Sequence, residues 1–390
     1  MSQTIDQFNS HIMGSYGRYD VVLEGGKDRA ATDEDGKQYI DFGSGIGTNS
    51  LGYCNDKWVE AICNQAHKIQ HTSNYYYTKI QADFAQKLCD MTGYSKVFFG
   101  NSGAEANECA IKLARKYSFD KYGKGRHNII TLVNSFHGRT IATLSATGQD
   151  NFHNYFFPFL EGFINVEANN IEDLKAKLDD TVCAVMFEFV QGEGGVVPLT
   201  KEFVDAIIEE CGKRDILTIA DEVQTGVGRT GKLLTSEIFN VKPNITTLAK
   251  GLAGGMPIGA CLADTKCDNV FTPGTHGSTF GGNPIACAGG MAVLDTLSDK
   301  KFIDEVAVKG KYITDKLMEI PAVKAVDGMG LMLGITFEKD NMAAGDVLKK
   351  ALDKGLLVLT AKAKIRFLPP LTITYDEIDK GITIIKEILA

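Results

Sequence analysis

The chain has 390 residues, of which 44% are hydrophobic and 23% charged, and its formal net charge is −8 at pH 7. This is the composition of an ordinary globular protein, and the length favours two domains. The acidic balance argues against nucleic-acid binding, which favours clustered basic residues. No apolar run reaches the 18 residues of a membrane-spanning helix. Nine scattered cysteines without a CxxC pair argue against disulfides or a zinc site and favour a cytoplasmic location.

The first 48 residues predict a helical or irregular lead-in and a small antiparallel sheet. Three short apolar runs predict its strands, at 21–23, 30–32 and 37–42. The glycine-rich run Gly43–Asn49 lacks the GxGxxG spacing of a dinucleotide fingerprint, so we predict a loop. On a predicted helix over 56–70, His67 and His71 have a spacing that can hold zinc. Because Lys68 stands where zincins have glutamate, we expect an ordinary helix and no metal.

From about residue 96 to 263, predicted strands and helices alternate, which indicates a parallel α/β sheet. The predicted strands are 96–99, 128–133, 182–190, 216–220, 245–249 and 257–263. The predicted helices in and around this region are 81–91, one that ends near 122, 171–178, 201–214 and 284–297. From residue 300 the pattern is that of an α+β domain, with helices at 300–319, 343–354 and 375–389 and strands at 323–326, 331–337, 356–359 and 364–367.

Two of the buried strands end in a single charged residue. Asp221 follows the apolar run 216–220, and Lys250 follows the run 245–249. Ligands of open α/β sheets bind just beyond the carboxyl ends of the strands. An acid and an amine placed there suit a nitrogenous, electron-accepting cofactor.

A third strand end leads into NSGAEANE, residues 101–108. Ser102 and Glu105 have the S-x-x-E spacing of a capping box, which alone indicates only a well-capped helix. Gly103 and Ala104 additionally leave the first-turn amides open, and these can bind a phosphate with the help of the helix dipole. The two interpretations are compatible.

Four further segments contain candidate ligand contacts. Phe136 offers a flat face for stacking and Arg139 a planar fork for a carboxylate, although a core aromatic beside a surface arginine would look the same. Glu193 lies in a glycine-rich loop past a strand end. Arg366 is flanked by apolar residues, and since charged residues are seldom buried without a partner, we expect it at the rim of a carboxylate pocket. Small hydroxyl residues among glycines at 274–284 suit a second anion contact or a plain turn.

A nucleotide hydrolase is the main alternative class. The run Gly226–Lys232 matches G-x-x-x-x-G-K after a strand. The motif requires Ser or Thr next, and Leu233 cannot coordinate Mg²⁺. Four residues, 222–225, also separate the strand end from the first glycine, so this function is less favoured.

These residues together are those needed to bind pyridoxal phosphate: a lysine for the Schiff base, an acid for the pyridinium nitrogen, an aromatic face and a phosphate cradle. From about Tyr16 onward the chain resembles the class III (subgroup II, fold type I) pyridoxal phosphate-dependent aminotransferases. The resemblance rests on seven ordered motifs: NSGAEANE, SFHGRT, QGEGG, ADEVQTGVGRTGK, LAKGLAGGMPIGA, HGSTFGGNP and RFLPPL. It implies a large cofactor-binding domain over 49–298 with a mostly parallel sheet, and a smaller α+β domain built from 1–48 and 299–390.

The resemblance implies roles for the cofactor contacts. Lys250 would be the Schiff-base lysine and Asp221 the partner of the pyridine nitrogen. Phe136 and Val223 would pack on the two ring faces, and Gln224 would contact the region of the 3-hydroxyl. The phosphate would be held by Ser102, Gly103 and Ala104, and by Thr279 of the neighbouring subunit, which implies a homodimer.

The resemblance also implies the substrate contacts, which are Tyr16, Arg139, Glu193, Ser278 and Arg366. In related enzymes the arginine that matches Arg366 binds the α-carboxylate of glutamate. The glutamate that matches Glu193 then screens that arginine when the diamine-derived substrate is bound. The nearest resemblance is to members that move the terminal amino group of N-acetylornithine to 2-oxoglutarate, giving N-acetylglutamate semialdehyde and glutamate, in arginine biosynthesis. Members that act on ornithine, succinylornithine, succinyl-diaminopimelate or 4-aminobutyrate, and a catalytically silent regulator, remain alternatives. Asp20, where many relatives have proline, and the loop 43–49 depart from the family pattern.

Overall fold

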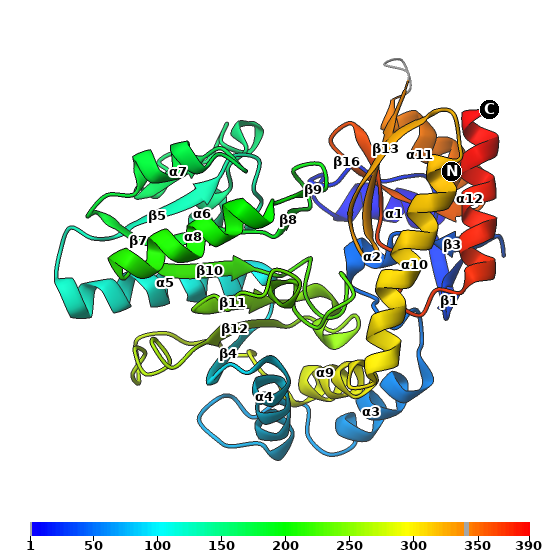
Figure 1. Ribbon diagram of the computed structural model, residues 1–390. Helices are drawn as coiled ribbons and strands as arrows, with labels where there is room; N and C mark the ends of the chain where they lie inside the picture. The colour runs from blue at the N-terminus through cyan, green and yellow to red at the C-terminus, as the bar shows by residue number, and fades with distance from the viewer. Residues whose placement is uncertain (1, 339–342) are drawn as a thin grey trace.

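The computed structural model describes residues 2–338 and 343–390 and has two unequal parts (Figure 1). The larger part is built around a seven-stranded sheet, and the smaller part combines the beginning and the end of the chain. No helix within these two ranges has the length and apolar composition needed to cross a bilayer.

The large sheet contains six strands of one direction and one of the other. Its order is β4 (Lys96–Gly100), β12 (Gly259–Ala263), β11 (Ile245–Leu248), β10 (Leu217–Asp221), β7 (Val182–Phe187), β5 (Asn128–Leu132) and β6 (Phe163–Val166). Only β12 is antiparallel to its neighbours, so the expected parallel arrangement is wrong for that strand. The segment 249–258 between β11 and β12 is too short for a parallel crossover, which needs about a dozen residues or more.

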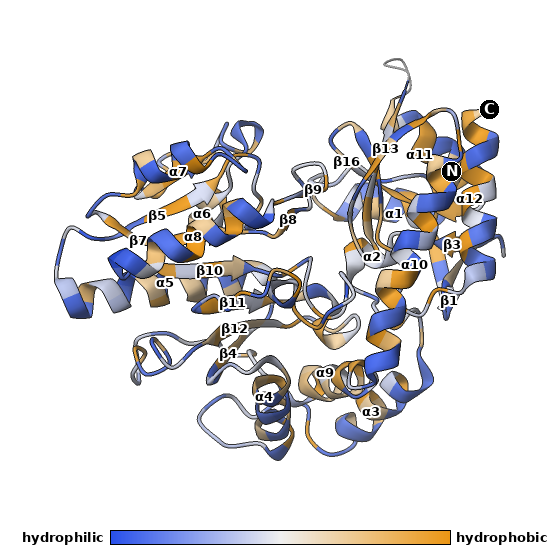
Figure 2. Ribbon diagram, viewed as in Figure 1, coloured by the Kyte–Doolittle hydropathy of each residue, from blue (hydrophilic) through white to orange (hydrophobic). Residues whose placement is uncertain are grey.

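Helices cover both faces of this sheet. The helices of this part are α3 (Asp56–Ala66), which packs on α9, α4 (Lys79–Thr92), α5 (Gly103–Tyr122), α6 (Ile141–Ala146), α7 (Ile171–Lys177), α8 (Lys201–Arg214) and α9 (Pro284–Leu297). In β7, Val185 and Phe187 pack into the cluster that contains α7 and α8 residues, whereas Ala184 and Met186 pack into the cluster that contains α5. Because both faces of β7 are buried, its sequence is a continuous apolar run. Figure 2 shows the hydrophobic residues of the central strands in orange.

Among its described residues, the smaller part has two four-stranded sheets and five helices. One sheet has the order β1 (Leu23–Lys27), β2 (Ala30–Asp33), β3 (Gln38–Asp41), β15 (Leu356–Leu357); the other β13 (Val323–Met329), β14 (Met332–Phe337), β17 (Lys364–Phe367), β16 (Leu359–Ala361). The helices are α1 (Gln3–His11), α2 (Ser44–Gly47), α10 (Lys300–Met318), α11 (Ala344–Asp353) and α12 (Tyr375–Leu389). Since β15 pairs with β3, both ends of the chain form one unit, which confirms the predicted fold class. The boundaries after residues 48 and 298 stay predictions.

Short elements complete the chain: β8 (Val190–Gln191), β9 (Val197–Pro198), and the 3₁₀ helices η1 (Asp150–Phe152), η2 (Thr235–Glu237) and η3 (Lys250–Ala253). The predicted helix over 56–70 ends earlier, since α3 stops at Ala66 and His67 is its C-terminal cap. His71 therefore lies beyond the helix, where its ring packs 4.9 Å from that of Phe280. The zinc-like spacing of the two histidines does not place them on one helical face.

Candidate active site

A cavity of about 370 Å³ opens at the carboxyl edge of the large sheet. Parallel strands end at a common edge, so the segments that follow β4, β5, β7, β10 and β11 all reach it. The cavity is lined by Thr48, Asn101, Ser102, Gly103, Ala104, Asn107, Phe136, His137, Gly138, Glu188, Glu193, Asp221, Val223, Gln224, Ala249, Lys250, Gly255, Met256, Pro257 and Ile258. Nine of the predicted site residues are therefore neighbours around one space: Ser102, Gly103, Ala104, Phe136, Glu193, Asp221, Val223, Gln224 and Lys250.

Asp221 is the last residue of β10 and is held by three hydrogen bonds. His137 Nδ1 and Asn107 Nδ2 each lie 2.8 Å from Oδ2 and donate to it, and the Val223 N–H donates to Oδ1 at 3.0 Å. Asn107 is itself held by Thr247 Oγ1, which donates to its Oδ1 at 2.7 Å. The carboxylate is buried and cannot rotate without losing these bonds.

Neither Asn107 nor the contact of His137 with Asp221 was expected from the sequence. Asn107 lies one helical turn after Gly103 on α5, so it faces the same side of the helix. The sequence signal that could have identified Asn107 as a site residue is its polar side chain on a helix face that otherwise has small and apolar residues. His137 Nε2 is buried without a hydrogen-bond partner among the described residues.

Lys250 begins η3, two residues after the end of β11, and lines the same cavity as Asp221. Its backbone has a φ of 45°, in the left-handed region that non-glycine residues seldom adopt. Burial of the amine lowers the pKa of Lys250, an effect that the charges of Asp221 and Glu193 oppose. A lowered pKa makes the amine a better proton carrier near neutral pH.

The N-terminus of α5 forms one wall of the cavity. Ser102 Oγ accepts the Glu105 N–H at 3.1 Å, as the capping motif predicts, but the Glu105 carboxylate accepts from the backbone of Asn101 instead of that of Ser102. A Cβ atom at Gly103 would lie 2.7 Å from Val223 Cγ1, so only glycine fits there. The first-turn amides stay accessible to an anion.

Arg366 on β17, in the smaller part of the protein, does not line the cavity itself but contacts two residues that do, Glu193 and Gln224. Its Nη1 donates to Glu193 Oε1 at 2.6 Å and to Gln224 Oε1 at 3.2 Å, while its Nε has no partner among the described residues. Burial acts to raise the pKa of Glu193, but the charges of Arg366 and Lys250 hold it below its ordinary value. Arg366 is only 3% exposed and is paired with a carboxylate, as its apolar sequence context suggested.

Besides Arg366, four predicted contacts do not line the cavity of this chain: Tyr16, Arg139, Ser278 and Thr279. The Arg139 guanidinium is exposed and lies over the ring of Phe152, 4.1 Å from its centroid. Ser278 Oγ accepts from Asn101 Nδ2 at 3.1 Å, next to the helix N-terminus, and Thr279 is exposed. Tyr16 is 73% exposed.

The glycine run that resembles a nucleotide loop lies elsewhere. No residue of Gly226–Lys232 lines the cavity, and Lys232 Nζ lies 3.3 Å from Asp304 on α10. The run consists of turns and is not followed directly by a helix N-terminus. It therefore lacks the phosphate-binding geometry of a nucleotide hydrolase.

The residues of the cavity fit pyridoxal phosphate. An amine of lowered pKa, a fixed carboxylate, an aromatic ring and a helix N-terminus shaped by a required glycine converge on one space. These groups match the aldehyde, the pyridine nitrogen, the ring face and the phosphate of the cofactor.

Comparison with known proteins agrees with this geometry. The family model "Aminotransferase class-III" matches residues 15–389. Acetylornithine aminotransferase of Haemophilus ducreyi is 48% identical and covers 100% of this chain and 99% of its own length. The crystal structure of acetylornithine aminotransferase from Elizabethkingia anophelis has 34% identity and a TM-score of 0.88, covering 99% of this chain and 98% of that one. Ornithine aminotransferase from Toxoplasma gondii ME49 has 32% identity and a TM-score of 0.94, covering 99% and 94%.

The family match spans nearly the whole chain, and its cofactor is the one that the cavity fits. The chain belongs to the class-III aminotransferases and is a pyridoxal phosphate-dependent enzyme.

Proposed function

We propose that this enzyme transfers the terminal amino group of N-acetylornithine to 2-oxoglutarate, giving N-acetylglutamate semialdehyde and glutamate. The observation that carries the proposal is the ion pair between Arg366 and Glu193 at the cavity, with Nη1 and Oε1 2.6 Å apart. The acetylornithine aminotransferases of H. ducreyi and E. anophelis support the same substrate.

The ion pair answers a recognition problem. The enzyme must accept glutamate through its α-amine but acetylornithine through an amine far from the α-carbon. Arg366 would bind the α-carboxylate of glutamate once Glu193 moves aside, and Glu193 would cover the arginine when a terminal amine enters. Arg139 and Ser278 would contact the remaining carboxylate, with Tyr16 at the entrance.

The bound cofactor supplies an electron sink for the carbon that loses its proton. Asp221 would hold a proton at the pyridine nitrogen, an orientation that His137 and Asn107 maintain. Lys250 would accept the proton from the substrate carbon that bears the reacting amine, which its lowered pKa supports. Phe136 and Val223 would hold the ring between them, Gln224 would contact the 3-hydroxyl region, and Ser102, Gly103 and Ala104 would bind the phosphate.

We also infer a homodimer in which Thr279 of one subunit contacts the cofactor phosphate in the other. Thr279 is exposed and does not line the cavity of its own chain. Large aromatic side chains are also exposed, among them Tyr75 at 94% and Tyr77 at 106%. Exposed apolar clusters of this kind mark interaction surfaces.

All nine cysteines are free, which supports the inference of a reducing cytoplasm.

Ornithine is the second candidate donor, because the T. gondii ornithine aminotransferase has the same fold over nearly the whole chain. The decisive experiment compares kcat/KM for acetylornithine, ornithine, succinyl-diaminopimelate and 4-aminobutyrate, each with 2-oxoglutarate. We expect acetylornithine to give the highest value. A higher value for any of the other donors would overturn the proposed substrate.

A further inference from the structure

Glu188 is a buried carboxyl group that lines the cavity but has no role in the mechanism above. It follows the buried strand β7, and its residue is 6% exposed. A charged side chain at the end of a fully apolar strand is costly unless it is hydrogen-bonded. Its contacts therefore indicate what it does.

Its two carboxylate oxygens accept from two different loops. The backbone N–H of Phe136, in the loop after β5, donates to Oε2 at 3.0 Å. The N–H of Gly192, in the loop after β8, donates to Oε1 at 3.4 Å. Phe136 is the proposed stacking residue, and Gly192 directly precedes Glu193 of the ion pair with Arg366.

The second loop has little freedom to move independently. A Cβ atom at Gly192 would lie 2.3 Å from Gln224 Oε1, so the backbone there lies against the Gln224 amide. That amide also accepts from Arg366. A displacement of Gly192 would thus change both the position of Glu193 and its contacts with Gln224.

We propose that Glu188 is a positioning residue that fixes the Phe136 loop and the Glu193 loop relative to each other. The position of the cofactor ring is thereby coupled to the Glu193–Arg366 ion pair. The inference rests on the proposed roles of Phe136 and of that ion pair. The cofactor ring and the ion pair then respond together to any change at Glu188.

The charged groups around Glu188 are consistent with this position. The pKa of Glu188 is raised to about 7, mainly by burial; the charge of Asp221 also raises it, whereas His137 and the two backbone N–H groups act to lower it. Glu188 in turn acts to raise the pKa of Lys250. The carboxyl group therefore lies within the same electrostatic environment as the acid and the amine of the site.

The chain contains a matched control in Glu222. This residue is also buried, accepts from two backbone N–H groups, those of Thr235 at 2.6 Å and Ser236 at 3.0 Å, and burial raises its pKa to about 7. It does not line the cavity. Glu222→Gln thus removes the same kind of interaction without touching either loop.

The test compares the holoenzymes of Glu188→Ala, Glu188→Gln and Glu222→Gln with the unaltered protein. The readouts are the visible circular dichroism of the bound cofactor, the cofactor dissociation constant, and the ratio of kcat/KM for glutamate to that for the best terminal-amine donor. We expect Glu188→Ala to weaken cofactor binding and to change the ratio, each by about tenfold, the loss of hydrogen bonds to a buried carboxylate. Glu188→Gln keeps one acceptor oxygen and should change both in the same direction by less.

Glu222→Gln should lower the melting temperature but leave the dichroism and the ratio unchanged. If Glu188→Ala does not fold, Glu188→Gln provides both readouts. Dichroism and ratio unchanged in the folded Glu188 variants, or a change in only one of the two, would overturn the coupling. The dichroism does not depend on the amino donor, so a wrong substrate assignment would show in the donor comparison and not here.

Discussion

Lys250 combines two features that oppose stability. Its backbone φ of 45° is unfavourable for a non-glycine residue, and its amine is buried, which lowers its pKa. Such strain persists where the surrounding structure determines it, here the end of β11 and the turn of η3. The cost at this residue is consistent with a functional amine and not with a structural one.

Replacing Lys250 by Ala should abolish transamination, because no other amine is placed opposite Asp221 among the described lining residues. Borohydride reduction of the unaltered holoenzyme, followed by peptide mass spectrometry, should find the cofactor attached to Lys250. The alanine variant should bind the cofactor without this attachment. Attachment at another lysine would contradict the assignment.

The Glu193–Arg366 pair should control which amine reacts. Glu193→Ala removes the carboxylate partner of Arg366, so with ornithine, in which both amines are free, the variant should accept the α-amine as well as the terminal amine, and product analysis should show mixed regiochemistry. A matched control is Asp327→Asn, which breaks the 2.6 Å ion pair of Asp327 with Lys364, two residues from Arg366 on β17. The control should keep a single product, and a single product from Glu193→Ala would refute the gate.

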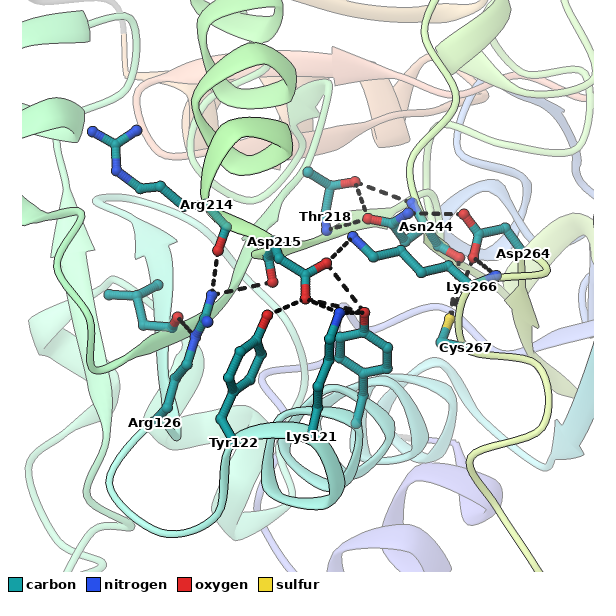
Figure 3. A network of polar contacts seen from close by, with 12 residues as sticks. Lys121, Tyr122, Arg126, Arg214, Asp215, Thr218, Asn244, Asp264, Lys266 and Cys267 are labelled. Atoms are coloured by element: carbon teal, nitrogen blue, oxygen red, sulfur yellow. Dashed lines mark hydrogen bonds and ion pairs between the residues drawn. The ribbon is translucent and has the colours of Figure 1, made fainter.

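At the scale of elements, a polar network joins α5, the end of α8 and the loop after β12 (Figure 3). Asp215, the C-terminal cap of α8, accepts from Lys121 at 2.7 Å and from Lys266 at 2.8 Å, and also from the hydroxyls of Tyr117 and Tyr122. Partial burial acts to raise the pKa of Asp215, but the hydrogen bonds from Lys121 and Lys266 hold it well below its usual range. One carboxylate thus joins three segments far from the cavity.

Asp215→Asn should lower the free energy of unfolding by about 1.5–3 kcal/mol at neutral pH, the range for hydrogen bonds to charged groups. Asn tolerates the backbone φ of 54° at this position, so the effect reports the charge. A carboxyl whose pKa is lowered by folding stabilises above its unfolded pKa of about 4 and loses this contribution as the pH falls further. The difference between variant and unaltered protein should therefore shrink in acid, as measured by urea unfolding at pH 7 and pH 3.

The control for this prediction is Asp120→Asn on α5, the helix that carries Lys121. Asp120 forms an ion pair with Lys116, one turn earlier on the exposed face of α5. Exposed pairs of this spacing contribute about 0.3–0.5 kcal/mol. Equal destabilisation by the two substitutions would contradict the special contribution of Asp215.

At the scale of the whole molecule, the proposed homodimer would complete the site of each chain. The exposed aromatic residues and the exposed Thr279 are explained if a second copy covers them and receives the threonine. A dimer would also explain why Ser278 lies beside the N-terminus of α5 and outside the cavity lining.

The shared site can be tested with two defective variants, Lys250→Ala and Thr279→Ala. In a mixed dimer, one site would combine the intact Lys250 of one subunit with the intact Thr279 of the other. Activity at limiting cofactor should therefore rise when the two variants are unfolded and refolded together, compared with each variant refolded alone. No gain on mixing would show that Thr279 acts within its own chain.

Much of this architecture could be predicted because the patterns that determine it are local. The last helix was expected over 375–389 and is found there, where Thr374 and Glu377 form a capping box. Asp221 and Lys250 could be named because apolar strands end at them. The edge strand β6 was missed, since its four residues include an exposed asparagine and show no continuous apolar run.

By itself, the sequence determined the class of fold, the cofactor and the residues that reach the carboxyl edge of the sheet. Hydrophobic periodicity, helix capping and glycine positions are patterns over a few residues, so they can be recognised in the sequence. The seven motifs can be recognised in the same way, because each is a short continuous run. Only the tertiary structure decided the direction of β12, the hydrogen bonds of His137 and Asn107 to Asp221, and the link that Glu188 makes between two loops. These depend on which distant segments meet when the sheet forms, and no local pattern specifies that.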